Sequence, residues 1–296
     1  MELDFTTLSA LVAEAQRQGC ALSALVLDQQ ARQTERPAQE LYREMRDRYQ
    51  VMVQAVQAGI APGVRSTSGL TGGDGHRMCR ASHAGGLTGP VFTGALARAL
   101  AVSEWNAAMG RIVAAPTAGS CGILPAAVLT LQEERGLPEQ ACVMSLFTAA
   151  AVGMVIARNA TLSGAQGGCQ AECGSASAMA AAALVELGGG TPAMAEQAVA
   201  MALKNSLGLV CDPVAGLVEI PCIKRNAAGV ANAFCAAEMA LAGIESAIPA
   251  DEVILAMKRV GDALPSALRE TAEGGLAATP TGCRLFEQVF GARREP

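Results

Sequence analysis

Apolar residues recur every three or four positions along most of this chain, which is the spacing of helices that bury one face. Leu8, Leu11 and Val12 are an early example. No segment alternates apolar and polar residues over several positions, as a half-buried strand does. We therefore predict an all-α fold. No internal repeat and no Pro/Ser-rich linker divides the chain, so we expect one domain over residues 1–296, with residues 1–60 as a helical N-terminal extension packed on it.

Prolines, glycines and hydroxyl residues mark where the helices begin and end. Pro37 lies in a charged stretch, residues 31–49, and should start or kink a helix there. Thr191 and Pro192 have the pattern of a helix cap followed by a first-turn proline. The periodicity predicts further helices over residues 92–111, 124–134, 138–158, 169–187, 192–205, 224–243, 251–263 and 265–271.

Two stretches are rich in Gly, Ser and Thr. Residues 60–90 contain so many glycines that we expect no regular element there. Residues 115–124 (APTAGSCGIL) form a second small-residue turn before a helix. Neither holds a phosphate-loop motif, whereas hydroxyls and backbone amides suit a carboxylate. We therefore expect Thr67, Ser68, Thr117 and Ser120 to contact the carboxylate or ammonium group of a substrate; ordinary loop capping is the alternative.

The composition narrows the class of protein. Hydrophobic residues make up 51% of the 296 residues, charged residues 17%, and the net charge is −5. An acidic chain lacks the basic face that nucleic acids or an anionic membrane surface require. Residues 141–157 carry no charge but are shorter than a membrane span, so they predict a buried core helix. The N-terminus does not resemble a secretion signal, and we expect a cytoplasmic protein with reduced thiols.

Three of the ten cysteines lie next to loop-forming residues. Cys169 follows two glycines, Cys211 stands in LVCDPV, and Cys222 follows a proline in IPCIKRN. Three loop cysteines can hold a four-iron cluster and leave one iron open. No C-x-x-C motif is present, so the spacing alone also allows three buried, packed thiols.

Several motifs resemble the α chain of iron–sulfur-dependent L-serine dehydratase: TSGLTGGD, APTAGSCGILPA, GCQAE, CDPVAGLVEIPCIKRNA and GGLAATPTG, from about Arg65 onward. The resemblance implies a [4Fe–4S] cluster on Cys169, Cys211 and Cys222. It also implies conversion of L-serine to pyruvate and ammonia, with the open iron as Lewis acid and no pyridoxal phosphate. The chain has only three lysines, of which Lys224 alone lies in a motif.

Other residues near these motifs have more than one possible role. Arg225 is predicted to clamp the substrate carboxylate, with a surface salt bridge as the alternative. Asn226 is a second substrate-binding candidate, and it and Glu172 stand next to predicted ligands, where they can donate or accept hydrogen bonds. Cys283 is a candidate fourth ligand, and an inert thiol is the alternative.

The general base is not assigned by the sequence. His76 and His83 are weak candidates, because the family's TSGLTGGD segment does not carry histidine at these positions. The resemblance implies a β chain as partner, which would supply the base; a homo-oligomer is also open. Two other functions remain: a related lyase acting on L-cysteine or L-threonine, and a non-catalytic iron–sulfur sensing module.

Overall fold

The computed structural model describes residues 5–291. Helices form its regular structure, and no β-strand occurs within this range, so the predicted all-α fold is confirmed. The α-helices are α1 (Leu8–Gln18), α2 (Leu22–Thr34), α3 (Ala38–Ile60), α4 (Asp74–His83), α5 (Pro90–Ala107), α6 (Ile123–Arg135), α7 (Glu139–Asn159), α8 (Gly164–Gly167), α9 (Ser175–Leu187), α10 (Pro192–Lys204), α11 (Cys222–Leu241), α12 (Ala250–Ala263) and α13 (Pro280–Phe290). A π-helical turn, η2 (Gln170–Gly174), precedes α9, and 3-10 turns lie at η1 (Ala118–Ser120), η3 (Val214–Gly216), η4 (Ser266–Leu268) and η5 (Gly275–Ala278).

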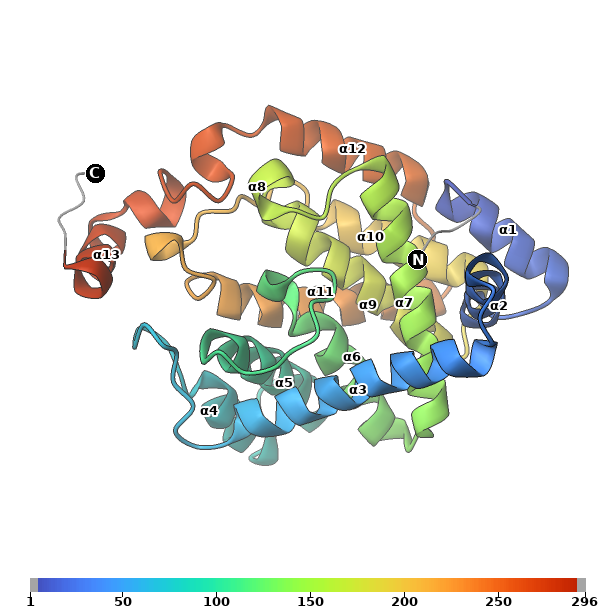
Figure 1. Ribbon diagram of the computed structural model, residues 1–296, viewed down its shortest axis with the longest axis horizontal. Coiled ribbons are helices and arrows are strands. Elements are labelled where there is room, and N and C mark those ends of the chain that lie inside the picture. The colour runs from blue at the N-terminus through green and yellow to red at the C-terminus, as the bar shows by residue number, and fades with distance from the viewer. Residues whose placement is uncertain (1–4, 292–296) are drawn as a thin grey trace.

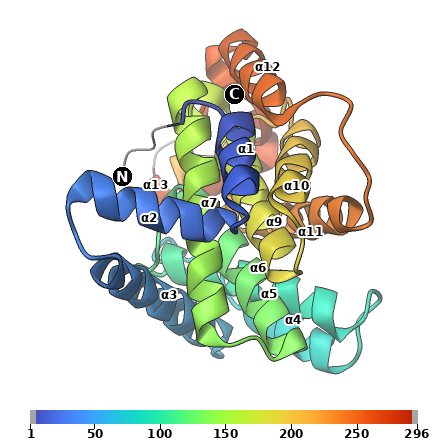
Figure 2. The ribbon, with the colours of Figure 1, turned by 90° about the vertical axis from the view of Figure 1, so that its right-hand side faces the viewer.

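Helix α9 lies at the centre of the fold (Figures 1 and 2). Residues 175–185 are all buried, and most of them are alanine or serine. Helices α6, α7, α10 and α11 pack around it. Small side chains let five helices approach one another closely, which explains how a chain with 3% aromatic residues fills its core.

Helix α7 has the length and hydropathy of a membrane span, but 67% of its most apolar window is buried inside the protein. Leu146, Phe147, Val152 and Ile156 are among its buried residues. It packs against α2 on one side and α9 on the other. The prediction of a core helix at residues 141–157 is therefore confirmed.

The first three helices cover one side of this core. Helix α1 contacts α10 and α12, α2 contacts α7, and α3 contacts α5. Helix α2 ends at Thr34 and α3 begins at Ala38, directly after Pro37, so the predicted helix start at this proline is confirmed.

The expectation of no regular element in residues 60–90 was wrong, because α4 lies within this stretch and carries both histidines. The backbone N–H groups of Asp74 and Gly75, at the start of α4, donate to the buried carboxylate of Glu104 on α5, at 2.7 and 3.0 Å. A carboxylate at this position satisfies unpaired donors and complements the helix dipole. Gly75 is also needed for packing, since a Cβ there would lie 2.8 Å from Ala101 Cα.

Two predictions near the C-terminus also need correction. Residues 265–271 form only the short turn η4, because the chain leaves it to pair with Cys211. Residues 280–290 form a further helix, α13, that we did not predict. Its start repeats the Thr-Pro pattern of α10: Thr279 accepts from Gly282 N, as Thr191 accepts from Met194 N.

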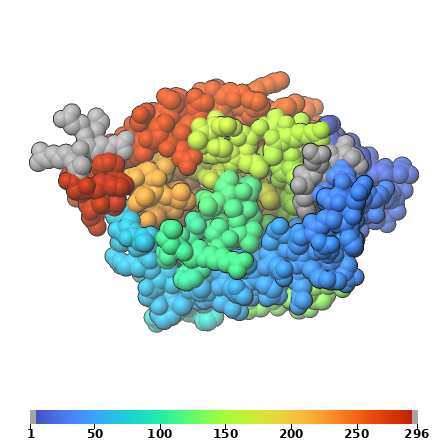
Figure 3. All heavy atoms as spheres, in the orientation of Figure 1, coloured from blue at the N-terminus to red at the C-terminus, as the bar shows by residue number. Residues whose placement is uncertain are grey.

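The segments that carry the predicted site residues meet on one face. Figure 3 shows the green 108–118 segment, the yellow-green region of α8 and the orange 211–221 loop next to one another on the front of the molecule. The chain between α5 and α6 thus lies next to segments that follow it by about fifty and about a hundred residues.

Candidate active site

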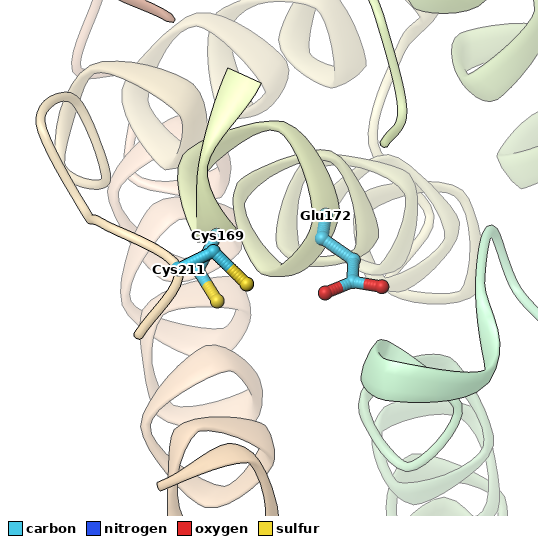
Figure 4. Close-up of side chains that lie close together, drawn as sticks. All are labelled: Cys169, Glu172 and Cys211. Atoms are coloured by element: carbon cyan, nitrogen blue, oxygen red, sulfur yellow. The ribbon is translucent and has the colours of Figure 1, made fainter. Parts of the chain in front are cut away.

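Cys169, Glu172 and Cys211 form one cluster, in which the two Sγ atoms and a carboxylate oxygen all lie within 4.8 Å of one another. Both cysteines are buried. Figure 4 shows the two thiols side by side, with the Glu172 carboxylate pointing to the same side of the ribbon. Thiolate and carboxylate groups at this separation can share one metal centre.

Buried hydrogen bonds hold the two cysteine-bearing segments together. Cys169 caps the π-helical turn η2, an irregularity that is frequent at functional sites. In this turn, Gln170 N donates to Leu209 O at 2.9 Å, and Gln170 Oε1 accepts from Gly208 N at 2.9 Å. The turn around Cys169 is thereby fixed against the chain that leads into Cys211.

Different helical elements of the fold carry three other cysteines, Cys173, Cys222 and Cys283. Cys222 is buried at the first position of α11. Cys173 is buried one turn after Cys169. Cys283 lies on α13, where its thiol faces Ala277 O at 4.0 Å, and it is not part of the cluster.

Arg225 lies against the cysteines. Its Nη1 donates to Cys169 Sγ at 3.4 Å and to Val210 O at 2.9 Å. Its Nη2 lies 2.8 Å from Asp212 Oδ1, and both side chains are largely buried. Arg225 therefore does form an ion pair, but this pair is buried beside the cysteines and does not lie on the surface.

Thr117 and Ser120 lie beside the cluster, as expected for site residues. The Thr117 hydroxyl donates to Glu172 Oε1 and lies 3.0 Å from Ser120 Oγ. Ser120 is fully buried. These two hydroxyls fix the orientation of the Glu172 carboxylate.

Asn226 holds this small-residue turn against α11. Its Oδ1 accepts from Gly122 N at 2.9 Å, and its Nδ2 donates to Gly119 O at 2.7 Å and to Cys222 O at 2.9 Å. The side chain is completely buried. Its amide is thus used to position the turn and the start of α11.

Thr67 and Ser68 make local contacts. Thr67 Oγ1 donates to Ala107 O at 3.0 Å. Ser68 Oγ accepts from Leu70 N at 3.1 Å and lies 3.2 Å from Ser66 Oγ. Both hydroxyls stabilise the loop that precedes α4.

Neither histidine belongs to the cysteine cluster. His76 Nδ1 lies 3.0 Å from Ile60 O, at the end of α3. His83 is exposed and lines a separate cavity of about 190 Å³, together with Cys79 and Arg98. The described structure therefore does not bring either histidine to the cysteines.

Two acidic residues of the site were not identified from the sequence. Glu270 reaches the cysteines because the chain pairs with Cys211: Glu270 N donates to Cys211 O at 2.8 Å. Glu219 is buried and accepts from Thr71 Oγ1 at 2.7 Å, which joins the TSGLTGGD loop to the loop before Cys222. Glu219 stands within the VEIPC motif, a signal that could have been used; Glu270 has no local signal, because tertiary pairing brings it here.

The site concentrates groups that carry or develop negative charge. Hydrogen bonds from Cys173 and Cys211 hold the pKa of Cys169 well below its ordinary value, and Arg225 acts in the same direction. Burial raises the pKa of Glu172 to about 7 and that of Cys222 to about 12. A bound cation would favour the ionised forms of these groups over the neutral forms that burial favours.

A glycine leaves room between these groups. A Cβ on Gly164, the first residue of α8, would lie 3.1 Å from Cys211 Sγ, 3.2 Å from Glu270 Oε2 and 3.3 Å from Glu172 Oε2. No side chain therefore separates the thiol from the two carboxylates.

Comparison with known proteins agrees with this site. The sequence profile of the family described as "Serine dehydratase alpha chain" matches residues 17–277. This chain belongs to the serine dehydratase alpha chain family. The family resemblance predicted from the cysteine motifs is therefore confirmed.

Three relatives in this family illustrate the range. The chain is 49% identical over 288 residues to the "Probable L-serine dehydratase, alpha chain" of Bacillus subtilis, covering 97% of this chain and 96% of the relative. It is 53% identical over 199 residues to the "L-serine dehydratase, alpha chain" of Peptoniphilus asaccharolyticus, covering 67% and 68%. It is 38% identical over 292 residues to the "L-serine dehydratase" of Streptomyces coelicolor, covering 96% of this chain but 63% of that relative.

The donor set of this serine dehydratase alpha chain family member fits a thiophilic metal centre. Cys169 and Cys211 are buried and come from two regions of the chain, with a Glu172 carboxylate oxygen within 4.8 Å of both thiols. Soft thiolate ligands select iron–sulfur clusters, zinc or copper(I) over magnesium or calcium. The site can therefore bind a metal centre.

Proposed function

We propose that this chain is the α chain of an L-serine dehydratase, which converts L-serine to pyruvate and ammonia. The observation that carries the proposal is the buried group of cysteines with Glu172 beside it, in a chain of this family. The names of the relatives supply the substrate.

We propose Cys169, Cys211 and Cys222 as the ligands of a [4Fe–4S] cluster. When bound through three protein ligands, such a cluster supplies a Lewis acid at its fourth iron. Cys211 and Cys222 flank a loop whose ends are joined by a hydrogen bond from Val214 N to Ile220 O at 2.8 Å. On this proposal, the loop would bring both cysteines to the same metal centre as Cys169.

The residues of this chain would hold the substrate and exchange its proton. Glu172 is the carboxylate closest to the cysteines and is held by Thr117. Its position makes it the candidate for the proton-transferring group within this chain. The turn at Ser120 and Gly119 lies directly beside it and would contact the polar groups of the substrate.

The cluster assignment is tested by anaerobic reconstitution. We expect the parent to bind about four iron and four sulfide per chain. Alanine at any one of Cys169, Cys211 or Cys222 should abolish the cluster, whereas Cys235→Ala, at an exposed cysteine, should not. Full iron content in two of the three ligand variants would refute the assignment.

The activity is tested by pyruvate formation from L-serine. The same assay with L-threonine and L-cysteine tests the alternative lyases. Faster turnover of either amino acid than of L-serine would show that this amino acid, and not L-serine, is the preferred substrate. If the protein binds a stable cluster but turns over none of the three amino acids in the presence of a partner chain, the result would favour a non-catalytic iron–sulfur sensing module.

We also propose a β chain as partner. The family is defined as an α chain, and the Streptomyces relative extends well beyond the region that this chain matches. The chain also exposes large apolar side chains, among them Met109 with 80% of its surface accessible. Pyruvate formation by the reconstituted α chain alone and with the cognate β chain tests this; equal rates would refute it.

A further inference from the structure

Both terminal nitrogens of the Arg225 guanidinium contact groups of the protein. Its Nη1 donates to both Cys169 Sγ and Val210 O, and its Nη2 pairs with Asp212. Only 15% of the arginine side chain and 4% of the aspartate side chain are exposed. A substrate carboxylate that bound at Nη1 or Nη2 would compete with these partners, and displacing one of them would leave a buried group unsatisfied.

Asp212 extends the chain of contacts to the C-terminal region. Its Oδ2 accepts from Leu276 N at 2.8 Å. The turn at Gly275 has φ of +60°, and a Cβ there would lie 2.4 Å from Asp212 Oδ2. The GGLA motif therefore has a physical reason for glycine at this position: the backbone must approach the Asp212 carboxylate closely.

These contacts form one path through the molecule. It runs from Cys169 Sγ through Arg225 to Asp212 and ends at the Leu276 amide. Val210 and Asp212 flank Cys211, so the same guanidinium holds the backbone on both sides of the second thiol. A buried ion pair adds little net stability compared with an apolar pair, but its geometry is directional.

We propose that Arg225 is a positioning residue of the metal centre rather than a substrate clamp. It orients the Cys169 thiolate, fixes Cys211 through Val210 and Asp212, and fastens the Leu276 segment to the site. Hydrogen bonds of this kind to metal ligands typically change metal affinity 10- to 100-fold when removed. The inference rests on the proposed function, since it concerns how the same centre is held.

The test compares Arg225→Lys, Arg225→Gln and Asp212→Asn with Arg98→Gln. Arg98 is a matched control, because 17% of its side chain is exposed and it pairs with Glu133 away from the cysteines. Reconstituted proteins are challenged with an anaerobic iron chelator, and the rate of iron release is followed. We expect about 10- to 100-fold faster release for Arg225→Gln, a partial rescue by Arg225→Lys, and the parental rate for Arg98→Gln.

Two further readouts separate positioning from substrate binding. The EPR spectrum without substrate should change in Arg225→Gln, because a hydrogen bond to a cluster ligand is lost. Serine kinetics of Arg225→Lys, with the β chain present, should show a fall in kcat that follows iron content. A raised KM with parental iron release and an unchanged EPR spectrum would overturn the proposal and restore the carboxylate clamp.

Amide hydrogen exchange in the cluster-free proteins tests the hydrogen-bond path independently of any metal. Exchange at the Leu276 amide should be faster in Arg225→Gln and in Asp212→Asn than in Arg98→Gln. Unchanged exchange would overturn the path. If the parent takes up no cluster, the proposed function fails, while this exchange measurement still decides the role of Arg225 in holding Asp212 and Leu276.

Discussion

Replacing Gly164 with alanine should close the space beside the cysteines. The added methyl would lie 3.1 Å from Cys211 Sγ, 3.2 Å from Glu270 Oε2 and 3.3 Å from Glu172 Oε2. All three distances are shorter than ordinary van der Waals contact, so each group must move by a few tenths of an ångström. The backbone itself accepts alanine, because Gly164 is helical and is not among the residues with positive φ.

Two opposing terms set the effect on stability. Alanine is favoured over glycine in a helix by up to about 1 kcal/mol. Crowding in a packed site typically costs about 1–3 kcal/mol. The free energy of unfolding of the metal-free protein should therefore fall by no more than about 3 kcal/mol. Metal sites, in contrast, require ligand distances within about 0.2 Å, so the same displacement should prevent cluster assembly.

The assay is iron and sulfide per chain after identical anaerobic reconstitution, with urea unfolding of the metal-free protein as the check on folding. We expect Gly164→Ala to retain less than about half of the parental iron while remaining folded, on the distance tolerance given above. Gly94→Ala is the control, since a Cβ there meets only Nη1 at the end of the Arg98 side chain, at 2.9 Å, away from the Cys169–Cys211 cluster. A Gly164→Ala protein with parental iron content and an unchanged EPR spectrum would refute the reasoning.

Two further predictions concern buried carboxylates. Glu104→Gln places an amide N–H₂ against one of the two N–H groups at the start of α4, so the free energy of unfolding should fall by about 1.5–3 kcal/mol. The control Glu134→Gln, at an exposed position, should change the free energy of unfolding by less than about 0.5 kcal/mol. Equal urea midpoints for the two variants would contradict this prediction. Glu172→Gln should keep its iron and lose about 100-fold or more in pyruvate formation if the carboxylate moves the proton; loss of iron instead would show that Glu172 is a metal ligand.

The helices could be predicted where local signals determine them. The apolar period predicted α6, α7 and α12 within a few residues, and Thr191 with Pro192 marked the start of α10. Helix α4 could not be predicted in this way, because its start is capped by Glu104, thirty residues further along the chain. Gly75 in this helix also has a poor helix propensity, but the close approach of Ala101 requires a glycine at this position.

The cysteines of the site could be found from their loop positions and motifs, but the contacts of the polar residues could not. Arg225 and Asn226 stand beside Cys222 in the sequence, which suggested substrate contacts for both. The fold gives their side chains protein partners that the sequence did not indicate: Val210, Asp212 and the turn at Gly119. Sequence proximity to a ligand identifies a residue as part of the site, but only the fold determines which partners saturate its hydrogen bonds.

The C-terminal region also contacts the site through hydrogen bonds that only the fold reveals. Leu276 is joined to Asp212, and the family match ends one residue later, at residue 277. Cys283 lies beyond it on α13, with its thiol facing Ala277 O and apart from the Cys169–Cys211 cluster. The Thr279 hydroxyl accepts from Gly282 N and caps the start of α13, so Cys283 lies in the first turn of a capped helix. The Asp212–Leu276 hydrogen bond joins the segment that leads into α13 to Asp212. Asp212 in turn pairs with Arg225, which we propose positions the cysteines, so the C-terminal segment is attached to the site through this ion pair.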